Sequence, residues 1–276
     1  MNIVRAPLRI TLGGGGTDLP GWYKENGGFL ISAAINKYIY LTGSRRNFDN
    51  KLWLSYSQVE ICDSVDQIKH EIFAKCLEKY DISRGIEIHS ISELPGGSGL
   101  GSSGTFTVSL LRLLNIMLRR DMTMKELAEF AASIEMVELG RSCGKQDQYI
   151  AVYGGVITLD ISKNGDVNVE VLDLDSITLK GLNSNLLLYY TGVSRDANMI
   201  LAEQNDSLRK RKLSSTVGMK RIQEIGYKSK EEILSGNLDE FGRLLDEHWE
   251  IKKSMSKKIS NQDIDNLYYY AKKCGA

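Results

Sequence analysis

The residues that most clearly indicate chemistry form a run of glycine and serine between Pro95 and Gly104. The run follows a predicted strand, Gly85–Ser92, and precedes an apolar predicted helix, Thr105–Leu118. The first turn of a helix carries unpaired N–H groups and a partial positive charge. Glycines that lead into such a turn let the backbone wrap phosphate oxygens. The sequence therefore predicts a phosphate-binding loop, in which the hydroxyls of Ser102 and Ser103 can contact a phosphate or its Mg²⁺.

This run also admits three other interpretations. Gly96 and Gly101 have the spacing of a Walker loop, but Ser102 stands where that motif needs lysine. The dinucleotide-binding fingerprint needs a βαβ unit and an acidic residue about 20 positions further on. Asp121 lies near that distance, but it follows a polar junction and no predicted strand. The third interpretation is a turn without a ligand, in which so many glycines before a helix would only cost stability.

A second glycine cluster, Gly13–Gly16, follows a predicted strand at Asn2–Leu12. The two clusters hold nine of the 26 glycines, whereas the chain has only 3 prolines. Clustered glycines without proline-rich tracts indicate shaped loops on a regular scaffold, because glycine permits positive φ and close backbone approach.

The composition is that of an ordinary globular protein. A chain of 276 residues corresponds to one large domain or two modest ones at about 150 residues per domain. Its 35 basic residues balance 35 acidic ones, which argues against general binding to nucleic acid or to a membrane surface. We find no apolar run of membrane-spanning length and no signal peptide at the N-terminus. The four scattered cysteines are expected to be reduced thiols in a cytoplasmic protein.

The elements that must position these loops are predicted from periodicity and turn residues. Further strands are predicted at Gly28–Leu41 (as a buried pair), Val152–Asp160, Val167–Leu174 and Asn185–Tyr190, with a hairpin turn at Asn164–Asp166. Helices are predicted at Val65–Tyr80, Thr123–Leu139, Ala197–Lys212, Thr216–Ile225, Leu238–Lys257 and Asp263–Lys273. Thr123 and Glu126 have the spacing of a capping box. The pattern predicts an α+β part at residues 1–180 and a mostly helical part at residues 181–276.

With both glycine clusters, the chain resembles the GHMP kinases, the family of galactokinase, homoserine kinase and mevalonate kinase. Pro95–Gly104 matches the family motif P-x-x-x-G-L-G-S-S-A, with Gly104 in place of alanine. Pro7–Asp18 matches the N-terminal motif, and Gly144–Tyr149 is similar to the segment that carries the catalytic aspartate. Within the family, these segments and Tyr190–Asp196 resemble the D-glycero-D-manno-heptose 7-phosphate kinases most.

The resemblance implies a two-domain fold. Residues 1–180 would form a ribosomal-protein-S5-like N-terminal domain, and residues 181–276 the helical part of a ferredoxin-like C-terminal domain. The family's third glycine-rich motif and its closing strands would follow Lys272–Ala276. We therefore expect an incomplete C-terminal domain, from a truncated sequence or an impaired product. Unpaired strand edges would then favour poor solubility or domain swapping.

The resemblance also implies roles for single residues. Asp147 would accept or orient the proton of the acceptor hydroxyl, and Arg9 would pair with it and stabilise charge on the transferring phosphoryl group. Ser103 and Glu135 would hold Mg²⁺, although Glu138 lies three residues on, on nearly the same helix face, and competes with Glu135.

The remaining residues would bind the two substrates. The nucleotide phosphates would be bound by Pro95, Gly96, Gly97, Ser98, Gly99, Leu100, Gly101, Ser102, Ser103 and Gly104. The sugar would be bound by Gly14, Gly15, Gly16, Thr17, Asp18, Lys145, Gln148, Thr191, Gly192, Ser194 and Arg195. Among these, Ser194, Arg195 and Lys145 are the candidates for a second anion site, which a substrate that already carries a phosphate needs.

The implied activity is an ATP-dependent, Mg²⁺-requiring transfer to the anomeric hydroxyl of D-glycero-D-manno-heptose 7-phosphate, in the synthesis of nucleotide-activated heptose for surface glycans. The expected partners are the phosphosugar and ATP, with no nucleic acid and no membrane. A related kinase acting on fucose or galactose stays open. So does a descendant that binds sugar and nucleotide without turnover, because the third motif is missing.

Overall fold

The computed structural model describes residues 1–192, 197–210, 213–256 and 258–276. The chain forms two compact units. Unit 1 contains residues 1–10 and 34–154, and unit 2 contains residues 11–33 and 155–276. Among the described residues, none of the helices is both long enough and apolar enough to traverse a bilayer. The division near residue 180 inferred from the sequence stays a prediction.

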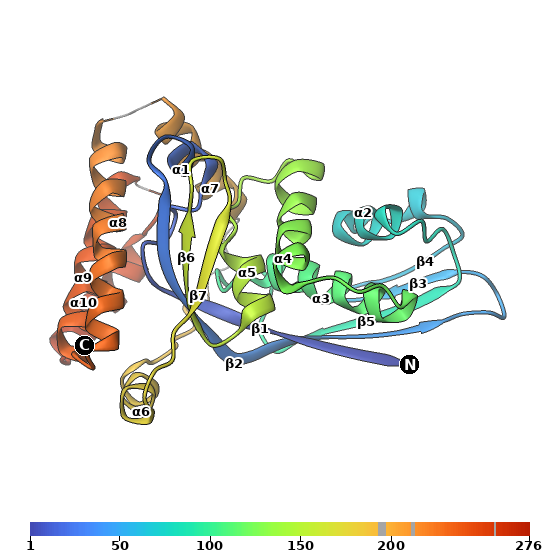
Figure 1. The fold of residues 1–276 in the computed structure, drawn as a ribbon, viewed down its shortest axis with the longest axis horizontal. Helices are drawn as coiled ribbons and strands as arrows, with labels where there is room; N and C mark the ends of the chain where they lie inside the picture. Colours follow the sequence, from blue (N-terminus) through green and yellow to red (C-terminus); the bar gives the residue numbers. More distant parts are fainter. Residues whose placement is uncertain (193–196, 211–212, 257) are drawn as a thin grey trace. The chain divides into compact units, whose positions relative to one another are not determined.

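Unit 1 is a sheet covered by helices on one face (Figure 1). Its strands are ordered β4 (Val59–Cys62), β3 (Leu52–Ser55), β5 (Ile86–Ser92) and β2 (Gly28–Arg45), and β3 pairs with β5 in parallel. Its longer helices are α2 (Glu71–Lys79), α3 (Ser102–Leu118), α4 (Met124–Ser133) and α5 (Gln146–Tyr153). A 3₁₀ turn, Val65–Gln67, precedes α2.

The core of unit 1 lies between the sheet and α3. Residues on β3 and β4 alternate between buried and more exposed, as expected for a sheet with one covered face. Helix α3 buries residues around most of its circumference, including Leu110, Leu111 and Leu114, so it is the central helix of the unit. The tip of α3 is thereby fixed by the core, and the glycine run leads directly into it.

Unit 2 pairs the first half of β2 with β6 (Val156–Ile161), and β6 with β7 (Val167–Val171). The strand β1 (Asn2–Gly13), whose residues 2–10 belong to unit 1, also pairs with β2. The helices are α1 (Pro20–Asn26), α6 (Ser176–Asn185), α7 (Ala197–Arg209), α8 (Leu213–Leu234), α9 (Leu238–Met255) and α10 (Gln262–Lys273). Helices α8, α9 and α10 lie side by side (Figure 1).

Most predicted elements are confirmed. The strand at residues 85–92, the hairpin at Gly165 and the capping box of Thr123 with Glu126 are all present. The helix predicted from Val65 begins only at Glu71, because the ring of His70 accepts a bond from the Phe73 amide and caps the helix there.

Two strand predictions are wrong. The segment Gly28–Leu41 is not a strand pair but part of one long strand, which pairs first with β6 and then with β5. The segment Asn185–Tyr190 is not a strand, because its first residue ends α6, the rest is irregular, and residues 187–190 are exposed, with Leu187 at 93%. An apolar run forms a strand only where a neighbouring strand satisfies its backbone.

Candidate active site

The glycine run forms a loop with left-handed turns at the tip of α3. Gly97, Gly99 and Gly101 have φ values of 75°, 76° and 81°, which side chains other than glycine rarely adopt. Gly101 is the N-cap of α3, and no side chain caps the helix. The N–H groups of the first helical turn are therefore left to a ligand or to water, as the phosphate-loop prediction requires.

Asp147 lies in the first turn of α5, a helix that the sequence analysis did not predict. Arg9 on β1 holds its carboxylate, with Nε at 2.7 Å and Nη2 at 2.6 Å from Oδ1. The same guanidinium donates through Nη1 to the carbonyl of Gly99, at 2.9 Å. Arg9 thus joins the carboxylate to the glycine loop.

The loop and the carboxylate are in direct contact. A Cβ atom added at Gly101 would lie 3.1 Å from Cγ of Asp147, and one added at Gly104 would lie 2.5 Å from its Cβ. The second value is shorter than real Cβ contacts, so the glycine at position 104 lets α3 and α5 approach this closely. The expected proximity of the α3 tip and Asp147 is therefore present in unit 1.

Glu135 is buried beside the same helix tip. It lies in a π-helical turn, Ile134–Glu138, that continues α4, and its side chain is only 3% exposed. Its carboxylate accepts hydrogen bonds from the hydroxyl of Ser103 and from Nε2 of Gln148, the latter at 2.8 Å. The competing carboxylate, Glu138, instead pairs with Lys79 on α2. Only Glu135 contacts Ser103 among these two.

The surroundings of Glu135 suit a divalent cation. Burial raises the pKa of Glu135 above that of an ordinary glutamate, and the negative charge of Asp147 acts in the same direction. A carboxylate in such a place needs a positive charge nearby, and Arg141 supplies one at 3.6 Å. Carboxylate and hydroxyl oxygens are the donors that Mg²⁺ prefers, and it needs only one or two of them. The pair Ser103 and Glu135 therefore fits Mg²⁺.

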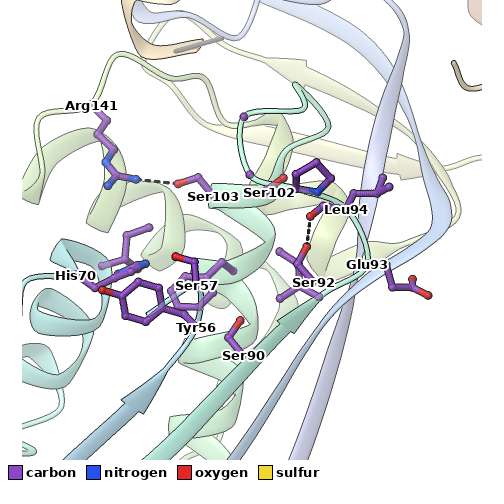
Figure 2. Close-up of a pocket in the computed structure, with 16 residues that line it drawn as sticks. Tyr56, Ser57, His70, Ser90, Ser92, Glu93, Leu94, Ser102, Ser103 and Arg141 are labelled. Carbon is purple, nitrogen blue, oxygen red and sulfur yellow. Dashed lines mark hydrogen bonds between the residues drawn. The ribbon is translucent and has the colours of Figure 1, made fainter. Parts of the chain in front are cut away.

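A cavity of about 600 Å³ in unit 1 lies at the glycine loop (Figure 2). Its lining residues are Ile39, Tyr56, Ser57, His70, Ile72, Ser90, Ser92, Glu93, Leu94, Pro95, Gly96, Gly97, Ser102, Ser103, Phe106 and Arg141. Figure 2 shows Arg141 donating to the hydroxyl of Ser103, at 2.8 Å. The volume and the mixture of polar and aromatic lining suit a nucleotide-sized ligand.

Aromatic rings form one wall of this cavity. Tyr56 meets the ring of His70 edge-on, and His70 in turn lies 5.0–5.1 Å from Phe73 and Phe106. Burial lowers the pKa of His70 below that of a free imidazole, so this wall is uncharged at neutral pH. Glu60 fixes the wall by accepting bonds from the Tyr56 hydroxyl and from the Lys69 and His70 amides. A flat, uncharged wall of this kind can bind a nucleobase.

The N-terminal glycine cluster lies in unit 2, and most of it is explained by packing. A Cβ at Gly14 would lie 2.1 Å from the carbonyl oxygen of Phe29, and one at Gly13 would lie 2.8 Å from the hydroxyl of Ser229. Thr17 is fully buried, and its hydroxyl lies 2.8 Å from the carbonyl oxygens of both Gly14 and Phe29. These residues fix the loop on β2 rather than presenting donors.

The rest of this loop consists of Gly15, Gly16 and Asp18. A Cβ at Gly15 would meet Thr11, whereas one at Gly16 would lie 2.8 Å from Nζ of Lys252. Asp18 is buried at 5% exposure and acts electrostatically on Lys252. In this loop, Gly16 and Asp18 therefore lie near the charged side chain of Lys252.

The remaining predicted sugar-binding residues are dispersed. The ammonium of Lys145 is held by both oxygens of Glu129, each at 2.8 Å. Gln148 contacts Glu135, as described above. Thr191 and Gly192 are exposed, and Ser194 and Arg195 lie outside the described residues. Substrate roles for these residues stay predictions.

The sequence analysis missed Arg141 and the aromatic wall. Arg141 stands three residues before the GKQDQY segment, and nothing in its spacing indicates that its guanidinium reaches Ser103. Tyr56, His70 and Phe106 are far apart in the sequence, so only the fold brings them together.

Comparisons with known proteins agree with this geometry. The family model described as "GHMP kinases N terminal domain" matches residues 67–155, a stretch that contains the glycine loop, Glu135 and Asp147. The D-glycero-alpha-D-manno-heptose 7-phosphate kinase of Campylobacter jejuni is 29% identical over 283 residues, covering 99% of this chain and 83% of that protein.

Two further relatives extend the comparison. The crystal structure of a D-glycero-D-manno-heptose 1-phosphate kinase from Bacteroides thetaiotaomicron matches with a TM-score of 0.76 and 28% identity, covering 91% of this chain and 79% of that one. The bifunctional fucokinase/GDP-fucose pyrophosphorylase of Arabidopsis thaliana is 22% identical over 97% of this chain. The chain spans only 27% of that longer protein.

Proposed function

Because the chain belongs to the GHMP kinase family, we propose that it transfers a phosphoryl group from ATP to the anomeric hydroxyl of D-glycero-D-manno-heptose 7-phosphate. The product is the 1,7-bisphosphate, an intermediate suited to the synthesis of nucleotide-activated heptose. The single observation that supports this most is the contact of Asp147 with Arg9 and with the glycine loop.

The chemistry follows from the positions of these groups. The N–H groups at the tip of α3 bind the phosphates of ATP, and the helix dipole favours their negative charge. The anomeric oxygen attacks the γ-phosphorus, a new O–P bond forms, and the bond between the γ-phosphorus and the bridging oxygen breaks to release ADP. Asp147 orients the attacking hydroxyl and accepts its proton. Arg9 fixes this carboxylate and offsets charge on the phosphoryl oxygens.

Mg²⁺ is the metal that this site would use. Ser103 and Glu135 would hold it, and the ion supplies positive charge to the phosphates during transfer. Arg141 lies beside both residues and is positioned to contact a nucleotide phosphate.

The acceptor is inferred from the relatives and from the loop in unit 2. Both heptose kinases named above act on a phosphorylated heptose, although their names differ in the position of the phosphate. In our proposal residues 1–180 carry the nucleotide and catalytic groups, and residues 181–276 form the helical part of the second domain. ATP as the phosphoryl donor is consistent with a cytoplasmic enzyme.

A kinase for an unphosphorylated sugar is the second candidate. It is favoured by the match to a fucokinase over nearly the whole of this chain. Asp18 and the glycine loop of unit 2 would serve either class of acceptor, since a buried carboxylate can bind two sugar hydroxyls.

The test is an ADP-release assay with ATP, Mg²⁺ and a panel of acceptors: D-glycero-D-manno-heptose 7-phosphate, the corresponding 1-phosphate, free heptose, fucose and galactose. We expect kcat/KM to be highest for the 7-phosphate. Asp147→Asn should lower kcat at least about 100-fold while ATP binding persists, because general base catalysis typically contributes 10²–10⁴-fold. Turnover restricted to free sugars would reject the proposed acceptor, and wild-type turnover by Asp147→Asn would reject the mechanism.

A further inference from the structure

Glu129 on α4 holds two residues of α5, and all three lie in unit 1. Both of its carboxylate oxygens accept hydrogen bonds from the ammonium of Lys145, each at 2.8 Å, and Oε1 also accepts one from the hydroxyl of Tyr149. Lys145 is buried and Tyr149 is fully buried, whereas the Glu129 side chain is 37% exposed. One carboxylate thus joins α4 to two buried side chains of α5 through charge-assisted hydrogen bonds.

The two residues that Glu129 holds flank Asp147 along the chain. Lys145 and Tyr149 are four residues apart, so they lie on one face of α5. Asp147 lies two residues from each of them, a rotation of about 200°, and therefore points to the opposite side of the helix. On that side its carboxylate is held by Arg9. Glu129 and Arg9 thus hold the first turn of α5 from two opposite sides.

Helix α5 depends on such contacts for its position. It has only 8 residues, and no side chain caps its first turn. A helix this short is marginal without tertiary packing. Its place also matters, because a Cβ at Gly104 on α3 would lie only 2.5 Å from the Cβ of Asp147. A shift of α5 would therefore move the carboxylate relative to the glycine loop, and a misplacement of about 1 Å can cost about 100-fold in rate.

We infer that Glu129 is a positioning residue for the transfer: it fixes α5 through Lys145 and Tyr149 and thereby sets the place of the Asp147 carboxylate. Glu129 acts through the helix and not on the substrates. This inference rests on the proposed function, since it names a support for the proposed base. It also gives Lys145 a role other than sugar binding, because both oxygens of Glu129 already hold its ammonium.

The test compares Glu129→Gln with Glu138→Gln as the matched control, because Glu138 also forms an ion pair between two helices of unit 1, with Lys79 on α2. With ATP and the acceptor that the wild-type protein uses best, Glu129→Gln should lower kcat at least about tenfold. It should leave KM for both substrates within about twofold, and Glu138→Gln should leave kcat within about twofold. A lower urea midpoint at unchanged kcat would make Glu129 a support of the fold alone. A raised acceptor KM at unchanged kcat would return Lys145 to sugar binding, and either result overturns the inference.

A second variant keeps the test independent of how well Glu129→Gln folds. Tyr149→Phe removes one hydroxyl and keeps the buried ring, so it should lower kcat by a smaller factor than Glu129→Gln. The double variant should lose no more kcat than Glu129→Gln alone, because both substitutions break the same contact. Losses of kcat that multiply fully in the double variant would contradict a shared contact.

A measurement without turnover separates this inference from the proposed function. If the wild-type protein phosphorylates none of the acceptors, the proposed function fails, and the hold of Glu129 on α5 is tested by amide hydrogen exchange. Exchange across residues 146–153 should be at least about tenfold faster in Glu129→Gln than in the wild type, since hydrogen bonds to a charged group are lost. Exchange there should be unchanged in Glu138→Gln. Equal exchange in all three proteins contradicts the proposed role of Glu129.

Discussion

At the scale of single residues, the structure distinguishes two neighbouring carboxylates that the sequence cannot tell apart as metal ligands. Glu135 and Glu138 are three positions apart, and an ordinary α-helix would present them on one face. The π-helical turn that contains them widens the spiral, so residues three apart no longer share a direction. Glu135 consequently contacts Ser103, whereas Glu138 contacts Lys79.

The pair of glutamates yields a prediction on metal dependence. Glu135→Gln should raise the Mg²⁺ concentration for half-maximal activity about 10- to 100-fold, because the substitution removes a charged oxygen from the proposed metal site. Because burial raises the pKa of Glu135, Mg²⁺ should bind the wild-type protein more tightly as the pH rises above the ordinary carboxyl range. The dependence is measured by titrating Mg²⁺ at fixed ATP between pH 5 and 8. Glu138→Gln is the control. An equal effect of this substitution on the Mg²⁺ requirement would contradict Glu135 as the metal ligand.

The candidate site residues can be proposed from the sequence more readily than the residues that support them. The resemblance to the family implies roles for Asp147, Arg9 and the glycine loop, and the structure places these residues in contact. The choice of Glu135 stayed open because the sequence carries no signal for the π-helical turn. Arg141 was not predicted at all, since its contact with Ser103 depends on how the segment before α5 folds back.

At the scale of elements, the glycine that begins α3 combines backbone strain with tight contact. Gly101→Ala would force a side chain into a left-handed conformation, at a cost of roughly 1–2 kcal/mol in stability. Its Cβ would also press on Asp147 and Arg9 at 3.1 and 3.2 Å. We therefore expect a lower urea midpoint together with at least about a tenfold loss of kcat, because small misplacements of catalytic groups are costly.

A matched substitution separates the two effects of that change. Gly236 also has φ of 75°, but a Cβ there would meet only the Thr178 hydroxyl, at an ordinary 3.4 Å. Gly236→Ala should lower the urea midpoint by a similar amount and leave kcat within about twofold of the wild type. If both variants lost turnover equally, the contact of Gly101 with Asp147 and Arg9 would have no effect on activity.

Element prediction succeeded where local signals dominate. The capping box of Thr123 and the hairpin at Gly165 are encoded within a few residues, and both are present. The predicted strand at Asn185–Tyr190 failed because strand formation depends on a partner, which a single apolar run does not specify. Helix α5 was missed because its eight residues are too few to show a clear period.

At the scale of the whole molecule, burial of histidine predicts how stability depends on pH. The folded protein keeps His248 neutral, with its pKa lowered from 6.5 to about 4, mainly by burial. Between pH 6.5 and 4, His248 is protonated in the unfolded chain but stays neutral in the folded chain. The free energy of unfolding therefore falls as the pH falls from about 6.5 toward 4. Glu135 acts in the opposite sense, since its raised pKa favours the folded state as the pH falls toward 4.5.

Urea midpoints at pH 7 and pH 5 test this linkage. Between these values His248 should cost the wild-type protein on the order of 1–2 kcal/mol, and His248→Gln should remove that part of the loss. An unchanged difference in His248→Gln would show that the ring is protonated in the folded protein.

The path of the chain between its two units limits how the protein can be divided. The polypeptide passes from one unit to the other at residues 10–11, 33–34 and 154–155, so unit 2 is assembled from two separate stretches. A gene fragment that ends at Gly154 would retain residues 28–33 but not β6, with which they pair. Such a fragment would expose a bare strand edge and self-associate. Any scheme that splits the protein for complementation or reporter use has to supply both stretches together, with the cut placed in an exposed turn such as residues 162–164.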